Sequence, residues 1–120
     1  MTGLRGLIRR RAFLAALHSW RGLKACFAHE EAFRLETLLA AICLPLAFVV
    51  AADAVELVLL WGSVLLLLIV ELLNSAVEAA IDRIGPEHHT LSGRAKDLGS
   101  AAVLIAIAFF ALTWLAILSG

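Results

Sequence analysis

Charged residues are missing from the middle of this 120-residue chain, and their absence excludes most soluble folds. The fourteen residues from Leu57 to Val70 carry no charge, and the chain as a whole is 62% apolar. An average soluble domain is only roughly half apolar. At a mean hydropathy of +0.97, a soluble fold of this size could not bury its apolar residues. The lipid bilayer must therefore be the solvent for much of the surface.

Basic residues are absent between Arg34 and Arg83 and again after Lys96. All ten lysines and arginines lie on either side of that long gap, although the net charge of the chain is zero. This arrangement argues against a nucleic-acid-binding protein and is typical of a membrane topology signal. The turn at Asp53 and Glu56 has no basic residue nearby, so we expect it on the non-cytoplasmic side. The N-terminus is then expected on the cytoplasmic side.

Cysteine is also scarce, and several common motifs do not occur. Cys26 and Cys43 lack the spacing of metal ligands, so we interpret both as packing residues and expect neither a disulfide nor a zinc site. The chain has no Walker motif and no Gly-x-Gly-x-x-Gly, which excludes the phosphate loop of soluble kinases. No repeat or long linker divides the 120 residues, which predicts one domain.

The hydrophobic pattern predicts an all-α membrane protein with an N-terminal surface helix and three transmembrane helices. Residues 5–30 mix basic and apolar side chains near helical spacing, which favours an amphipathic helix in the headgroup region, where Trp20 belongs. The predicted transmembrane helices cover residues 35–52, 56–84 and 93–118.

Two local features complete this prediction of the helices. Pro45 is expected to kink the first transmembrane helix, which a neighbouring helix can tolerate. Gly85 and Pro86 are expected to stop the second one, and Thr90 or Ser92 to cap the third.

A polar stripe follows the second predicted transmembrane helix. Its spacings of three, four, seven and eleven place five side chains on one helical face: Glu71, Asn74, Ser75, Glu78 and Asp82. The simplest interpretation is a seam where amide and hydroxyl groups bond across helices. A carboxylate at membrane depth, however, costs several kcal/mol unless it is paired, bound to metal or facing water. The glutamates therefore make the stripe a candidate functional site.

The start of the third predicted transmembrane helix carries a second polar face. Gly93, Lys96, Asp97 and Ser100 lie together there, among small residues that permit close helix contact. A basic, glycine-bearing helix N-terminus is also a good phosphate site, because free backbone N–H groups point from it. The histidines of the preceding loop do not by themselves predict a metal site.

Polar motifs in three separate parts of the chain agree in order and spacing with one known family. These motifs are Ser19–Lys24 with Glu30–Glu36, then Glu71–Arg83, and then Ser92–Ala102. From about Ser19 to Thr113 the chain closely resembles the prokaryotic diacylglycerol kinase family.

The resemblance implies an integral-membrane lipid kinase that is homotrimeric, with composite sites between protomers. It implies phosphorylation of diacylglycerol to phosphatidic acid, with ATP as the donor and Mg²⁺ as the cofactor. On the family's pattern, Glu71 is the catalytic base, assisted by Asn74 and Lys96, and Glu30 and Glu78 bind the metal.

The resemblance also assigns substrate contacts. The nucleotide residues are Arg11, His18, Glu30, Glu78, Glu87, His89, Lys96 and Asp97. The lipid-substrate residues are Trp20, Arg21, Lys24, Ala32, Phe33, Arg34, Glu36, Glu71 and Ser100. Pro86 and His88 depart from the residues common in the family, and Glu31 is an additional acid.

The chemistry of these residue types agrees with phosphoryl transfer. Mg²⁺ prefers a few carboxylates together with phosphate oxygens and water, which Glu30 and Glu78 allow. Lys96 supplies positive charge, and Glu71, deeper in the bilayer, can meet the hydroxyl of a lipid.

Three alternatives remain open at this point. Within the family, the acceptor is either diacylglycerol or a polyprenol such as undecaprenol. The intramembrane carboxylates are also compatible with a proton or cation channel, and the chain with a purely structural bundle. Against a channel, Leu57–Val70 is interrupted only by Trp61, Gly62 and Ser63.

Overall fold

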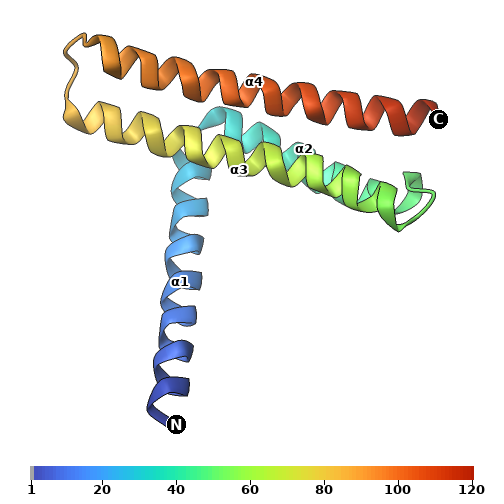
Figure 1. Ribbon diagram of the computed structural model, residues 1–120, viewed down its shortest axis with the longest axis horizontal. Helices are drawn as coiled ribbons and strands as arrows, with labels where there is room; N and C mark the ends of the chain where they lie inside the picture. Colours follow the sequence, from blue (N-terminus) through green and yellow to red (C-terminus); the bar gives the residue numbers. More distant parts are fainter. Residues whose placement is uncertain (1) are drawn as a thin grey trace.

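The computed structural model describes residues 2–120, which form four helices joined by short connections (Figure 1). The helices are α1 (Thr2–His29), α2 (Glu31–Val50), α3 (Ala54–Ile84) and α4 (Thr90–Ser119). No strand occurs in this part of the chain. The all-α class predicted from the hydrophobic pattern is thereby confirmed.

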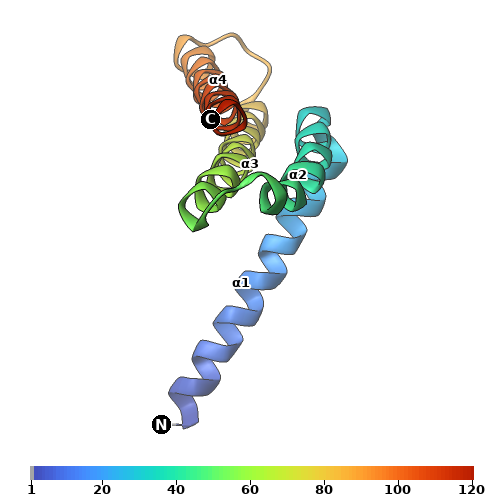
Figure 2. The ribbon, with the colours of Figure 1, turned by 90° about the vertical axis from the view of Figure 1, so that its right-hand side faces the viewer.

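Helices α2, α3 and α4 are each long and apolar enough to cross a membrane. The shortest, α2, has 20 residues, which corresponds to about 30 Å of helix. The three run alongside one another, whereas α1 leaves them crosswise (Figures 1 and 2). This is the layout of a multi-pass membrane protein with one helix along the membrane surface.

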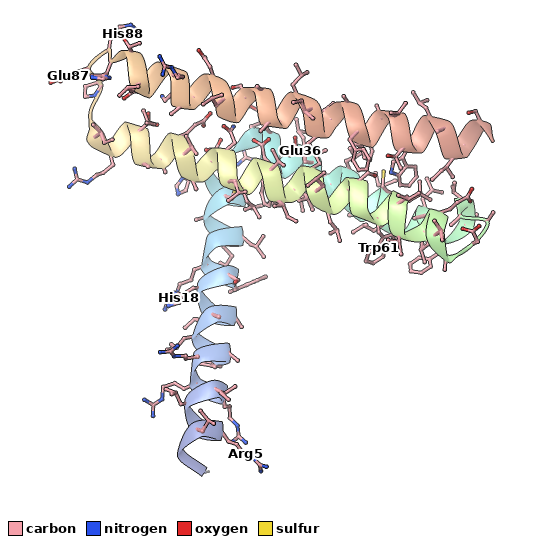
Figure 3. The ribbon with its side chains drawn as sticks, in the orientation of Figure 1. Arg5, His18, Glu36, Trp61, Glu87 and His88 are labelled. Carbon is pink, nitrogen blue, oxygen red and sulfur yellow. The ribbon has the colours of Figure 1, made fainter. Side chains whose placement is uncertain are left out.

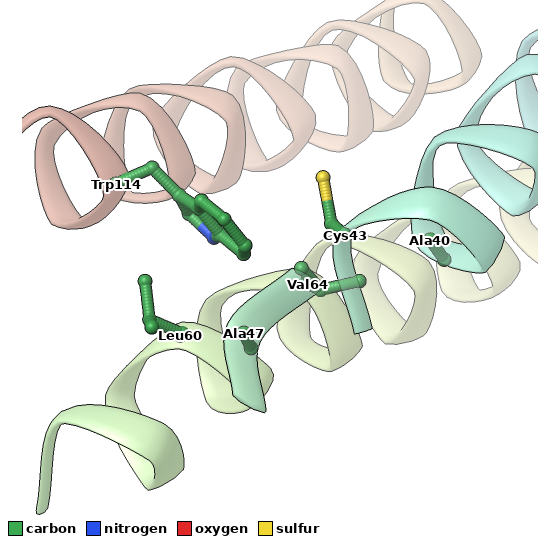
Figure 4. Packing of buried hydrophobic residues seen from close by; sticks show 6 residues of the cluster. All are labelled: Ala40, Cys43, Ala47, Leu60, Val64 and Trp114. Atoms are coloured by element: carbon green, nitrogen blue, oxygen red, sulfur yellow. The ribbon is translucent and has the colours of Figure 1, made fainter. Parts of the chain in front are cut away.

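The buried core lies where the three long helices meet. Ala40, Cys43 and Ala47 of α2 pack against Leu60 and Val64 of α3, and Trp114 of α4 closes the cluster (Figure 4). The small side chains of α2 let its backbone approach α3 closely, which is how helices pack in lipid.

A second contact between α2 and α3 lies beside Pro45. The indole Nε1 of Trp61 donates a hydrogen bond of 2.9 Å to the carbonyl oxygen of Leu44. The ring of Trp61 also meets Phe48 edge-on. Helix α2 continues through Pro45 to Val50.

The turn between α2 and α3 is closed by its two acids. Asp53 caps α3 by accepting a hydrogen bond from the backbone N–H of Glu56, at 2.9 Å. The Glu56 carboxylate accepts in return from the N–H of Ala52. Such reciprocal capping satisfies backbone donors that the helix leaves open, so these acids have a structural reason to be here.

The connection between α3 and α4 ends the first helix where expected and caps the second with a different residue. Gly85 follows α3 with a φ of 149°, which favours glycine. Helix α4 is capped by His89, whose Nδ1 accepts from the N–H of Leu91 at 3.0 Å. The prediction that Thr90 or Ser92 caps this helix is therefore wrong; the helix already begins at Thr90.

The junction between α1 and α2 is a single residue, Glu30, with extended backbone angles. One guanidinium nitrogen of Arg34 donates to the carbonyl oxygens of Phe27 and Ala28, at 2.9 and 3.0 Å. These bonds satisfy carbonyls that the end of α1 leaves without a helical partner. Arg34 thus ties the direction of α1 to the first turn of α2.

Candidate active site

Four carboxylates converge where α3 passes the junction of α1 and α2. Glu71 of α3 is only 5% exposed and is the buried carboxylate among the described residues. Glu30 and Glu78 are its charged neighbours, and Glu36 of α2 lies close enough to interact electrostatically with it. One Glu36 oxygen, Oε2, is buried and has no hydrogen-bond partner in residues 2–120. Contacts between three helices therefore create this acidic cluster.

Cys26 and Ser75 line the same junction. The Sγ of Cys26 donates to the hydroxyl of Ser75 at 3.5 Å. Burial is the largest influence on the Cys26 thiol and raises its pKa, so the group stays a protonated packing residue and not a nucleophile. A cavity of about 290 Å³ opens beside it, with Glu30 and Leu72 in its wall.

Glu30 and Glu78 carry carboxylate oxygens, the kind of ligand that Mg²⁺ prefers. Both are half-buried. Within residues 2–120, neither carboxylate takes part in a side-chain hydrogen bond or ion pair, so their oxygens are available to a cation. No group of three or more His, Cys, Asp or Glu gathers as a metal site in that range. Two carboxylates suit Mg²⁺ that arrives with phosphate oxygens and keeps some water.

A second polar group lies at the end of α3 and the start of α4. Lys96 donates to Asp82 at 2.9 Å, and both side chains are well exposed. An exposed pair of this kind contributes little stability, so the contact with Asp82 does not hold Lys96 in one position. Glu87, His89 and Lys96 line a common cavity of about 230 Å³. Since His89 Nδ1 caps α4, its Nε2 is the atom that can meet a ligand.

The remaining nucleotide residues lie elsewhere. Arg11 and His18 are exposed on α1, seven residues apart and hence on one face. Figure 3 shows His18 far from Glu87, which lies at the α3–α4 loop. Asp97 is exposed on α4, one residue beyond Lys96. A single chain therefore brings together only part of the predicted nucleotide set.

The residues assigned to the lipid substrate fall into three groups. Trp20, Arg21 and Lys24 are exposed along α1, and Ala32 and Ser100 are exposed on α2 and α4. Glu36 and Glu71 belong to the acidic cluster.

Phe33 and Arg34 make contacts within the chain. Phe33 is 3% exposed and packs inside the chain. Arg34 caps α1.

Comparison with known proteins places this arrangement in a family. The sequence pattern of the prokaryotic diacylglycerol kinase family matches residues 17–118. The chain belongs to this family. The match includes the acidic cluster, the cavity lined by Glu87, His89 and Lys96, and nearly the whole of the three long helices.

Individual relatives agree over most of the chain. A diacylglycerol kinase of Escherichia coli is 53% identical over 104 residues, or 87% of this chain and 85% of the relative. One from Haemophilus influenzae is 49% identical over 94% of this chain and 92% of its own length. One from Pseudomonas aeruginosa is 43% identical over 99% of this chain and 93% of its own length.

Sequence reasoning did not find the close packing of Gly99 on Asn74. A Cβ added to Gly99 would overlap the Asn74 amide oxygen. That oxygen, Oδ1, is buried and has no partner in residues 2–120. The missing side chain of Gly99 is therefore what lets the α4 backbone lie against Asn74. The only signal in the sequence was the series of small residues at the start of α4.

We expect Gly99→Ala to destabilise the protein by about 1–3 kcal/mol, because the new methyl group overpacks the Asn74 site. The midpoint of thermal unfolding of the purified protein measures this. Gly93→Ala is the matched control on the same helix, since a Cβ there meets nothing within 4 Å.

The double variant Gly99→Ala/Asn74→Ala should recover much of the lost stability, since shortening Asn74 makes room for the methyl group. If Gly99→Ala is as stable as Gly93→Ala, the close packing is not the constraint on this position.

Proposed function

We propose that the protein is a lipid kinase that transfers the γ-phosphoryl group of ATP to the hydroxyl of diacylglycerol. The observation that carries this proposal is the buried Glu71 of α3, with Glu30 and Glu78 beside it, in a member of the prokaryotic diacylglycerol kinase family. Relatives named diacylglycerol kinase, at 43–53% identity, support the choice of lipid. ATP is the donor and phosphatidic acid the product.

In this proposal Glu71 acts as the general base. It lies seventeen residues into α3, or about 26 Å from the start of that helix. With Ala54 at the external side, this puts its carboxylate in the cytoplasmic part of the bilayer, where a lipid hydroxyl meets the hydrocarbon. Glu71 accepts the hydroxyl proton as the oxygen attacks the γ-phosphorus, and ADP leaves with the bridging oxygen.

Glu78 and Glu30 act on the nucleotide phosphates. Glu78 lies seven residues after Glu71, about 10 Å closer to the cytoplasm. Together with Glu30 it would bind Mg²⁺, which neutralises phosphate charge when present. Lys96, His89 and Glu87 at the cytoplasmic end of α3 and α4 contact the nucleotide. Asn74, between the two glutamates, helps to position the reacting groups.

The topology follows from the basic residues. With all ten of them in the stretches that end at Arg34 and begin at Arg83, the N-terminus and the α3–α4 loop lie in the cytoplasm, and the Asp53–Glu56 turn lies outside. The protein then belongs to the bacterial inner membrane.

We also propose a homotrimer with composite sites. In one chain, His18 on α1 lies apart from Glu87 in the α3–α4 loop (Figure 3). Arg11 lies seven residues before His18 on the same helix face. A neighbouring protomer that supplies one of these groups would complete a nucleotide site. Long apolar faces of α2 and α4 remain exposed in the single chain and are available for such contacts.

The proposal predicts lipid-dependent consumption of ATP. Purified protein in mixed micelles with Mg²⁺ and ATP should form ADP and a phosphorylated lipid when diacylglycerol is supplied. Undecaprenol in the same micelles is the comparison. Faster turnover of undecaprenol would make the protein a polyprenol kinase, and no lipid-dependent ADP with either lipid would overturn the kinase proposal.

Glu78→Gln is predicted to lower turnover at limiting Mg²⁺ by at least about a hundredfold, since metal neutralisation of phosphate charge contributes several kcal/mol. Lipid binding should change little. Turnover measured across a range of Mg²⁺ concentrations tests this. Glu31→Gln removes an exposed carboxylate to which neither the metal nor a substrate is assigned, and it serves as the comparison. Unchanged Mg²⁺ dependence in Glu78→Gln would contradict the metal assignment.

A further inference from the structure

Two arginines share the face of α1 that carries its aromatic side chains. Arg5 and Arg9 precede Phe13, Trp20 and Phe27 at spacings of four, four, seven and seven residues. On a helix, these spacings place all five side chains on one stripe. The three aromatic side chains are 67%, 60% and 43% exposed, as expected of residues that meet the bilayer.

The structure shows which way this stripe points. In Figure 3, Arg5 lies on the side of α1 where most of the length of the long helices lies, and His18 points to the other side, on which the α3–α4 loop lies. The bilayer surrounds the long helices, so Arg5 faces the membrane. Arg9, one turn further on, faces it too. His18 and Arg11 share the opposite, cytoplasmic face.

The electrostatics of α1 are one-sided. Residues 2–29 contain six basic residues and no acidic residue. Neither Arg5 nor Arg9 forms a side-chain hydrogen bond or ion pair within residues 2–120. A guanidinium on a long stem can reach from an interfacial helix to the phosphate level, and it binds phosphate through two parallel N–H groups.

We propose that Arg5 and Arg9 form a binding site for the phosphate group of an anionic phospholipid on the membrane-facing side of α1. The site lies more than twenty residues from Glu30, so it is separate from the acidic cluster. The occupant is a lipid of the surrounding bilayer, because the arginines share their stripe with the aromatic residues that enter the membrane surface.

A phosphate contact adds to the rotational preference that Phe13, Trp20 and Phe27 already give α1. Leu4 and Leu7, 60% and 46% exposed, lie away from the arginine stripe. The lipid phosphate holds Arg5 and Arg9 toward the membrane, which leaves Arg11 and His18 facing the cytoplasm. Only this last consequence, nucleotide contact by Arg11 and His18, rests on the proposed function.

The test uses the full chain in phosphatidylcholine nanodiscs that contain a nitroxide-labelled lipid. A fluorophore is attached through Ala12→Cys, one turn from Ile8 and Ala16, in a background with Cys26→Ala and Cys43→Ala. Quenching by labelled phosphatidylglycerol relative to labelled phosphatidylcholine reports the local enrichment of anionic lipid. With Arg5 and Arg9 unchanged, labelled phosphatidylglycerol should quench the fluorophore clearly more than labelled phosphatidylcholine does.

Arg9→Gln should lower that excess by roughly fivefold, the effect of one basic residue at a membrane surface. Arg10→Gln is the matched control, since it removes the same charge about 100° around the helix; the excess should be nearly unchanged. Arg9→Lys should retain part of the excess, because it keeps the charge and loses the paired N–H groups.

Three outcomes would overturn the site. These are no excess in the parent protein, an equal loss in Arg9→Gln and Arg10→Gln, and full competition by millimolar inorganic phosphate. The assay contains no ATP and measures no turnover. A failed kinase assay and a failed lipid assay are therefore distinguishable.

Discussion

Burying the carboxylate of Glu71 in a membrane helix is the constraint on which the rest of the structure depends. At 5% exposure, the group has lost nearly all contact with solvent, and a carboxylate at this depth is costly unless its surroundings compensate. The groups around it come from three helices and include further carboxylates, Glu30 at the α1–α2 junction and Glu36 on α2, whose like charge does not compensate for the burial. An acidic cluster of this kind destabilises the fold and is expected where chemistry takes place.

The α1–α2 junction is what brings the acidic cluster together. Glu30 alone joins α1 to α2, and Arg34 caps the last turn of α1. These contacts set α1 across the long helices and hold Glu30 beside α3. The same crosswise placement lets α1 lie along the membrane surface. One short connection therefore determines both the acidic cluster and the surface helix.

The sequence predicts the helices and the stripe because both depend on local periodicity. Apolar runs long enough to span lipid require helices, and spacings of three and four residues place Glu71, Asn74 and Glu78 on one face. Contacts between helices could not be predicted in this way. The approach of Glu36 to Glu71 and of Gly99 to Asn74 depends on how the helices cross, which no local pattern specifies. The His89 cap was missed for a related reason, since serine and threonine are commoner in that position.

The central claim is that Glu71 acts as a general base and is not only a polar contact between helices. The rate of a single turnover of Glu71→Gln tests this claim most directly. Glutamine keeps the shape and the hydrogen-bonding capacity of the side chain but cannot accept the lipid proton. The account predicts that the variant assembles and binds Mg·ATP as the parent protein does, yet transfers phosphate roughly 10²–10⁴-fold more slowly. An assembled Glu71→Gln protein with a near-normal rate of phosphoryl transfer would contradict it.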